Sequence, residues 1–238
     1  MKKIITISCA LILAITLTGC STKKTVETDA KKFKSEYESL NGKTNSSGKE
    51  HRTVSIPEDN PFVYTSASDI VEKIENGETF YVYFGSKLCP WCRSVIEKSI
   101  EVAKKKGIET IYYVDVWDDE GNEILRDKYT VENGEAKKIK DGTKDYYKLL
   151  DLFDSVLGDY TLSDEDGNEI STDEKRIYAP TFIYIKDGKV TRTTDGTSEN
   201  QKDSREDFTD EILKDEEELF NKFFVKKIEG ACSVSSAC

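Results

Sequence analysis

One stretch of the chain, residues 81–92, restricts the fold more than any other. It reads Tyr-Val-Tyr-Phe-Gly-Ser-Lys-Leu-Cys-Pro-Trp-Cys, so an apolar run typical of a strand leads directly into a Cys-x-x-Cys motif that opens an amphipathic helix. A cysteine at a helix N-terminus lies near unpaired backbone N–H groups and the positive end of the helix dipole. Both favour the thiolate, which is the attacking form of cysteine. The stretch therefore predicts a strand–helix unit suited to thiol chemistry.

The two cysteines are predicted to have different tasks. Cys89 is the candidate nucleophile, and Cys92, one helical turn further on, can close on a mixed disulfide and release the product. Pro90 occupies the first helical position, where its missing N–H removes no hydrogen bond. Trp91 lies between the cysteines, and we expect it to present an apolar surface to a substrate.

These residues resemble the redox site of the thioredoxin superfamily. A second motif, Tyr178-Ala179-Pro180-Thr181-Phe182, precedes a strand-like run over residues 182–185. The resemblance implies that Pro180 is the superfamily's cis-proline, packed against the cysteine pair, with Ala179 beside it in the substrate groove. A proline that simply begins a strand is the alternative. The resemblance covers residues 60–228 and implies an α/β fold, with a thioredoxin-like mixed sheet flanked by helices.

Three features depart from the best-known members of that superfamily. Leu88 and Tyr83 stand where many thioredoxins have a tryptophan and a buried acid, so a proton relay through a buried carboxylate of the usual kind is in doubt. The Cys-Pro-aromatic-Cys motif is more similar to glutaredoxins and to some disulfide-forming proteins, and it loosely resembles thioredoxin-type accessory proteins of bacteriocin export. An insertion over residues 130–176, with a helix over 143–157, precedes the cis-proline strand.

The N-terminal 19 residues predict export. Two lysines, an apolar run and Leu17-Thr18-Gly19-Cys20 resemble a bacterial lipoprotein signal, which implies cleavage before Cys20 and attachment of lipid to its sulfur. An uncleaved anchor or a simple secretory signal is the alternative. We therefore expect the protein at the extracytoplasmic face of the cell membrane, held there by its lipid.

Residues 20–59 are polar and predict a flexible tether, while residues 60–230 predict one domain. Phe33, Tyr37 and Leu40 lie at helical spacing, which could give a transient or docked helix, and His51 is expected at the surface. Within the domain, periodicity and end signals predict helices and strands in thioredoxin-like order. The expected helices cover residues 66–76, 90–106 and 204–228, and Ser66 or Ser68 is the expected cap of the first. The expected strands cover 79–84, 108–117, 181–185 and 189–193, and Asp187-Gly188 predicts a hairpin turn between the last two.

The cysteines of the tail, residues 231–238, have three interpretations. Cys232 and Cys238 could form a disulfide that only staples the chain end, an auxiliary redox pair that exchanges with Cys89 and Cys92, or half of a zinc site. Export disfavours free thiols, and the spacing of Cys232 and Cys238 departs from that of usual zinc sites, so a disulfide that staples the chain end is favoured. We expect no cofactor and no metal.

The net charge restricts the classes of partner that the protein is expected to bind. It is −11 for the whole chain, and loss of Lys2 and Lys3 with the signal would make it more negative still. Such a surface argues against nucleic acid or an anionic membrane surface as a partner. The sequence thus predicts a lipid-tethered thiol–disulfide oxidoreductase that acts on cysteines of exported proteins or peptides, with a membrane redox partner as a further expectation. The alternative is a non-catalytic binding lipoprotein in which Cys89 and Cys92 form a structural bridge.

Overall fold

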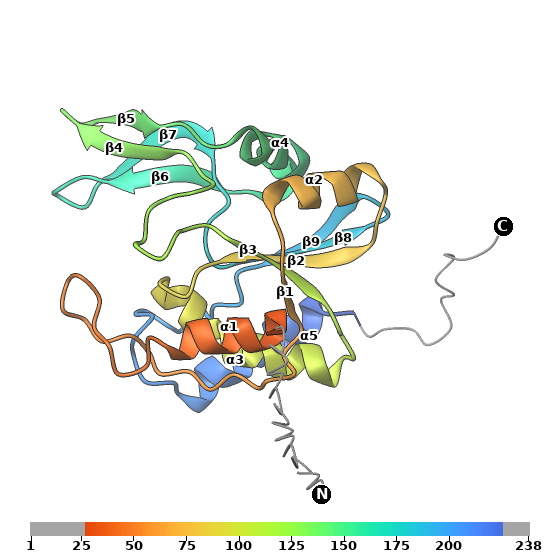
Figure 1. Ribbon diagram of the computed structural model, residues 1–238. Helices are drawn as coiled ribbons and strands as arrows, with labels where there is room; N and C mark the ends of the chain where they lie inside the picture. The colour runs from red at the N-terminus through yellow and green to blue at the C-terminus, as the bar shows by residue number, and fades with distance from the viewer. Residues whose placement is uncertain (1–26, 226–238) are drawn as a thin grey trace, which may run out of the picture.

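A computed structural model describes residues 27–225 (Figure 1). The expected signal over residues 1–19, Cys20, and the tail cysteines Cys232 and Cys238 lie outside the described residues. The described chain is mixed α/β, with helices on both faces of a five-stranded mixed sheet, so the predicted fold class is confirmed at this level. The strand order is β1-β3-β2-β8-β9. The strands are β1 (Phe62–Tyr64), β2 (Phe80–Gly85), β3 (Ile111–Asp115), β8 (Thr181–Lys186) and β9 (Lys189–Thr194).

Strand β2 lies at the centre of the sheet because all six of its residues are buried. It pairs in parallel with β3 and antiparallel with β8. A near-continuous apolar strand of this kind needs cover on both faces. Strands β8 and β9 form a hairpin whose turn residues, Asp187 and Gly188, both have positive φ, as the Asp-Gly pair predicted.

Each face of the sheet carries its own hydrophobic cluster. Helices α1 (Asp29–Glu38), α3 (Pro90–Lys105) and α5 (Asp210–Phe223) cover one face, while α2 (Ala67–Glu75) and α4 (Lys144–Phe153) cover the other (Figure 1). The first cluster contains Cys92 and is rich in aromatic rings, whereas the second is mainly aliphatic. Helix α2 begins with a capping box formed by Ser66 and Asp69, as a serine at that position predicted.

Residues 27–59, the N-terminal strap, are packed against the domain, so the predicted flexible tether is wrong for this part of the chain. The docked helix that the spacing of Phe33 and Tyr37 allowed is present as α1. Phe33 and Tyr37 of α1 are both 0% exposed, and they lie on one helix face because they are four residues apart. The Phe33 ring stacks on Phe62 of β1 at 4.2 Å. His51, expected at the surface, is also buried. Two aromatic side chains thus dock a segment whose average composition is polar.

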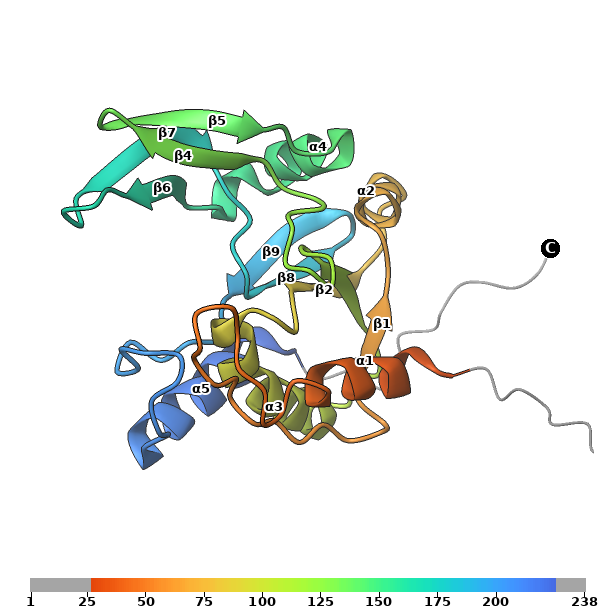
Figure 2. The same ribbon diagram turned by 60° about the vertical axis from the view of Figure 1, so that its left-hand side comes forward.

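The expected insertion forms a separate unit, the hairpin lobe (residues 128–175). It contains two antiparallel hairpins, the predicted helix and a single 3₁₀ turn. The hairpin strands are β4 (Lys128–Glu132), β5 (Glu135–Lys140), β6 (Asp159–Ser163) and β7 (Glu169–Lys175), and the 3₁₀ turn η1 covers Asp154–Val156. Figures 1 and 2 both show the lobe on the side of the sheet that carries α2, with its hairpins extending outward.

Two predicted helices differ from the structure in detail. Helix α4 ends at Phe153 rather than near residue 157, because the chain tightens into η1 there, and the helix buries Tyr146, Leu149 and Phe153. Helix α5 begins at Asp210, capped by Thr209, rather than near residue 204. It also buries a carboxylate, Glu216, within its inner stripe.

Candidate functional site

Cys89 caps the N-terminus of α3. The Cys92 N–H donates to the Cys89 sulfur at 3.2 Å, and that sulfur lies 3.3 Å from the carbonyl oxygen of Ala179. The Ala179–Pro180 peptide bond is cis, as the resemblance implied. Two sequence motifs separated by 90 residues are therefore in direct contact.

Opposing effects act on the Cys89 thiol. Burial favours the neutral thiol, but hydrogen bonds from the Cys92 side chain and backbone N–H outweigh it, so that the pKa of Cys89 lies below its usual value. The Trp91 backbone N–H and the Arg126 guanidinium lower this pKa further. Cys89 is only 4% exposed, less than expected for an attacking residue.

Cys92 has the opposite character. It is 0% exposed and belongs to the aromatic cluster between the sheet and α3. Burial raises the pKa of Cys92 well above its usual range, the neighbouring Cys89 adds to the rise, and hydrogen bonds from the Tyr83 hydroxyl and the Ser86 backbone oppose it. Among the described residues, Cys89 and Cys92 are both free thiols. The pair thus combines a sulfur that favours the anion with one that favours the thiol.

A cleft of about 390 Å³ runs along this site. Trp91, Ala179, Pro180 and Thr181 line it, which places the expected groove residues together, although Pro90 is not among them. The hairpin lobe contributes Val156, Leu157 and Gly158 to the lining. The loop after β9 contributes Asp195, Thr197 and Gln201. The lobe and this loop therefore border the surface next to the cysteines.

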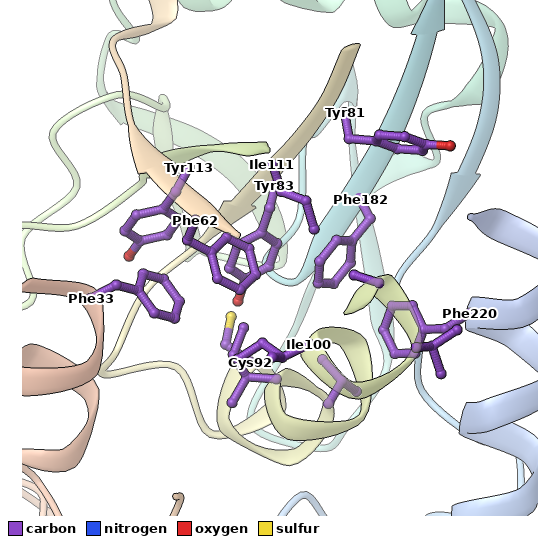
Figure 3. Close-up of a cluster of buried hydrophobic side chains, with 14 of the residues drawn as sticks. Phe33, Phe62, Tyr81, Tyr83, Cys92, Ile100, Ile111, Tyr113, Phe182 and Phe220 are labelled. Atoms are coloured by element: carbon purple, nitrogen blue, oxygen red, sulfur yellow. The ribbon is translucent and has the colours of Figure 1, made fainter. Parts of the chain in front are cut away.

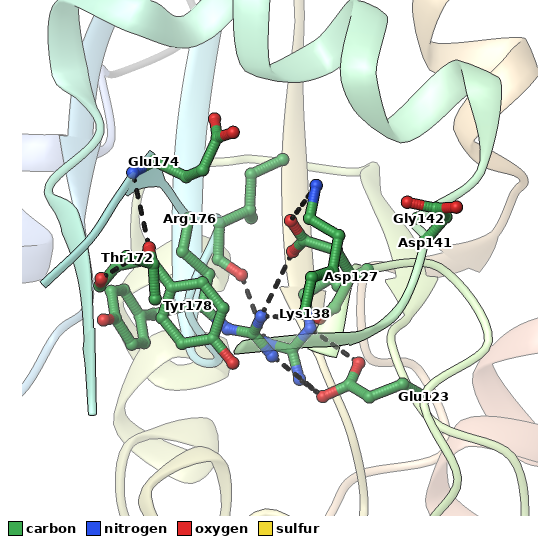
Figure 4. A network of polar contacts seen from close by, with 12 residues as sticks. Glu123, Asp127, Lys138, Asp141, Gly142, Thr172, Glu174, Arg176 and Tyr178 are labelled. Carbon is green, nitrogen blue, oxygen red and sulfur yellow. Dashed lines mark hydrogen bonds and ion pairs between the residues drawn. The ribbon is translucent and has the colours of Figure 1, made fainter. Parts of the chain in front are cut away.

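A buried ionic network joins the two chain segments that lead into and out of the hairpin lobe (Figure 4). The Arg126 Nη1 donates to the carbonyl of Ile177 at 3.1 Å, and its Nε donates to Glu123 at 2.8 Å. Arg176 donates to the same carboxylate at 3.0 Å and to the backbone oxygen of Asp127 at 2.9 Å. Sequence reasoning missed these residues, because nothing in their spacing distinguishes them from surface charges. Arg126 matters for the site through its effect on Cys89.

A second buried arginine fixes the N-terminal strap next to the cysteines. Arg93, in the first turn of α3, is 1% exposed. Its guanidinium donates to the carbonyl oxygens of Arg52 and Tyr37, each at 2.8 Å, and to the Asn41 side chain at 2.9 Å. The helix that carries the Cys-x-x-Cys motif therefore holds the strap in place, and the strap contributes to the surroundings of Cys92.

No protein-family model matches the chain, and no significant match is found among curated proteins. Within residues 27–225, no group of three or more His, Cys, Asp or Glu side chains could hold a metal ion. No helix in that range is both long and apolar enough to cross a bilayer.

Proposed function

We propose that the protein is a thiol–disulfide oxidoreductase with a thioredoxin-like fold. One observation carries the proposal, namely the position of the Cys89 sulfur at the N-terminus of α3, next to the Ala179 carbonyl and followed by a cis-proline. The opposite pKa directions of Cys89 and Cys92 support it, since the attacking sulfur must be an anion while the resolving one waits as a thiol.

The proposed reaction has two exchange steps. The Cys89 thiolate attacks one sulfur of a substrate disulfide, forms a mixed disulfide, and releases the other substrate sulfur as a thiolate. Cys92 then attacks the Cys89 sulfur, so that the Cys89–Cys92 disulfide forms and the remaining substrate sulfur leaves. The proton of Cys92 ends on that departing sulfur. The same steps in reverse transfer a disulfide to a reduced substrate. In both directions the substrate lies next to Trp91 and Pro180, which line the cleft.

The substrates we propose are cysteines of exported proteins or peptides. This rests on the resemblance of the N-terminus to a lipoprotein signal, with Cys20 as the lipidated residue and the extracytoplasmic membrane face as the location. A membrane redox partner would regenerate the cysteine pair.

Alkylation and trapping test the proposal together. In the reduced protein at neutral pH, Cys89 should react with iodoacetamide faster than Cys92, because only its pKa lies below the usual value. A Cys92→Ala variant should accumulate mixed disulfides with disulfide-containing peptides, since attack survives and resolution is lost. Cys89→Ala is the matched control and should trap nothing. Equal alkylation rates together with no adducts would contradict the proposal.

The reduction potential of the pair tells the direction of electron flow. Equilibration with glutathione would give a value near −120 mV for an oxidant and near −270 mV for a reductant. A value below about −300 mV is typical of structural disulfides.

A non-catalytic binding protein is the second candidate, favoured by the 4% exposure of Cys89. In that case the pair is a structural bridge, its potential is low, and the Cys92→Ala variant captures no peptide.

A further inference from the structure

Tyr83 occupies the centre of the cluster around Cys92. It belongs to β2, is 0% exposed, and stacks between Phe182 at 4.3 Å and Tyr113 at 5.5 Å. Figure 3 shows its hydroxyl oxygen next to the Cys92 sulfur. The sequence marked this position only because a buried acid is absent there. The structure places a neutral hydrogen-bond donor at the same position.

Gly85 makes room for the Tyr83 ring. The two residues lie on the same face of β2, because they are two positions apart. A Cβ atom on Gly85 would lie 2.2 Å from both Cζ and the hydroxyl oxygen of Tyr83, which is far inside van der Waals contact. The ring therefore lies along the strand over the glycine and toward Cys92.

Tyr37 fixes the Tyr83 hydroxyl from the other side. The two hydroxyl oxygens are 3.2 Å apart in a buried setting. Each hydroxyl has one proton, so if Tyr83 donates to sulfur, Tyr37 must donate to Tyr83. The backbone of Tyr37 is itself held by Arg93, whose Nη1 donates to the Tyr37 carbonyl. The N-terminal strap and the helix of the motif thus cooperate to orient one proton.

We infer that Tyr83 is a catalytic residue that donates a hydrogen bond to the Cys92 sulfur as it becomes an anion, and that Tyr37 is a positioning residue that orients the Tyr83 hydroxyl. The inference rests on the proposed function, since it assigns a donor to the resolution step.

The proposed donor acts without changing the balance of that step. Cys92 gives its proton to the departing substrate sulfur and forms the bond to Cys89, while Tyr83 keeps its own proton throughout. Burial raises the pKa of Tyr83 well above its ordinary value, with the neighbouring Cys92 and Tyr37 adding to the rise. Tyr83 therefore remains a donor over the whole range in which thiols titrate.

Single-turnover kinetics of resolution test the inference. The mixed disulfide between Cys89 and a cysteine peptide is formed, and release of the peptide is followed from pH 6 to pH 10. In Tyr83→Phe, release should be slower by about tenfold or more, the usual worth of a hydrogen bond to a charged group. Its pH midpoint should also move up by about one unit. Tyr37→Phe should change both quantities in the same direction, by a smaller amount.

Tyr113→Phe is the matched control. Tyr113 is buried in the same stack, but its hydroxyl points away from the sulfur in Figure 3. Its release rate and pH midpoint should equal those of the unaltered protein. The melting temperature of each variant shows that it is folded.

Release by Tyr83→Phe at the unaltered rate and midpoint would overturn the inference and leave the proposed function standing. If the Cys92→Ala variant forms no mixed disulfide at all, the proposed function itself is wrong. If Tyr113→Phe slows release as much as Tyr83→Phe, the effect belongs to packing, and the inference is again overturned.

Discussion

Two segments extend the central sheet unit, and they attach to it with different shares of apolar and ionic contacts. The N-terminal strap inserts aromatic side chains into the core, with Phe33 and Tyr37 fully buried. The hairpin lobe leaves most of its strand residues exposed and is joined through α4 and the buried charges around Arg126 and Arg176. Apolar docking contains no titrating group, whereas a buried ion pair depends on both partners being present and charged. The strap should therefore act as part of the core, and the lobe as a unit that can be loosened separately.

The largest effect is expected for Phe33→Ala in the strap. Phe33 packs against Tyr37, Phe62 and Tyr113, so its loss leaves a cavity that α1 cannot fill. We expect the free energy of unfolding to fall by about 3–5 kcal/mol. Urea denaturation measures it. Ile139→Ala in β5 of the lobe, at a side chain that is 52% exposed, is the control and should change stability by less than about 0.5 kcal/mol. A similar small change for Phe33→Ala would restore the tether interpretation.

A smaller effect is expected for Arg176→Met, in the segment that directly follows the lobe. The substitution removes the bonds to Glu123 and to the Asp127 backbone, and the buried Asp127 carboxylate loses its ion pair with Arg176, while Glu123 keeps Arg126. We expect a loss of about 2–4 kcal/mol. Hydrogen exchange should locate the loosening in residues 128–175 and leave α1 protected. The neighbouring Lys175→Met removes an exposed ion pair and should cost less than about 1 kcal/mol. Equal loosening of strap and lobe would show that they form one cooperative unit.

Glu216→Gln should give the smallest change, and one that depends on pH. Burial raises the pKa of Glu216 to about 8, only partly offset by Lys98 and Arg52. An acid whose folded pKa is raised loses stability as pH rises from its unfolded pKa toward its folded pKa. Between pH 6.5 and pH 8 the unaltered protein should therefore lose roughly 2 kcal/mol that the variant keeps. Below its ordinary pKa, the two proteins should differ little on this account.

Comparison of the two proteins at each pH isolates Glu216, because all other titrating groups are shared. The pKa of His51 is lowered by burial and by Arg93 and Arg205, but His51 is common to both proteins and cancels in the comparison. Urea denaturation at pH 6.5, 7.2 and 8 measures the difference. Parallel pH profiles for both proteins would mean that the Glu216 carboxyl is solvated.

Local signals predicted the elements that carry the cysteines. An unbroken apolar run identified β2, the Cys-Pro pair placed the start of α3, and Asp187-Gly188 fixed the β8–β9 turn. These features depend on neighbours within a few residues. The contact between Cys89 and Ala179, by contrast, was expected only from the resemblance, because periodicity does not bring distant loops together.

The sequence alone could not predict that the whole strap is docked, nor the position of the Tyr83 hydroxyl, and the reasons are physical. The average composition of residues 20–59 is polar, which outweighed the helical spacing of Phe33 and Tyr37. The residue that holds this segment, Arg93, lies far along the chain. The sequence singles out position 83 only for the absence of an acid, while the donor role that we propose for Tyr83 depends on the open space over Gly85 and on a hydroxyl from α1. Buried charges such as Glu216 and Arg176 were invisible because their burial depends on tertiary packing.

The docking of the strap also limits how far the protein can reach. Packed structure is already present at Thr28, which caps α1. If Cys20 carries the lipid, about eight residues separate the membrane anchor from the folded body, a span of at most roughly 28 Å when fully extended. A free tether up to residue 59 would have allowed about five times that distance. The cysteine pair would then act only on partners that emerge at the bilayer surface or are embedded in it. The protein would meet these partners by diffusing in the plane of the membrane rather than through the surrounding solution.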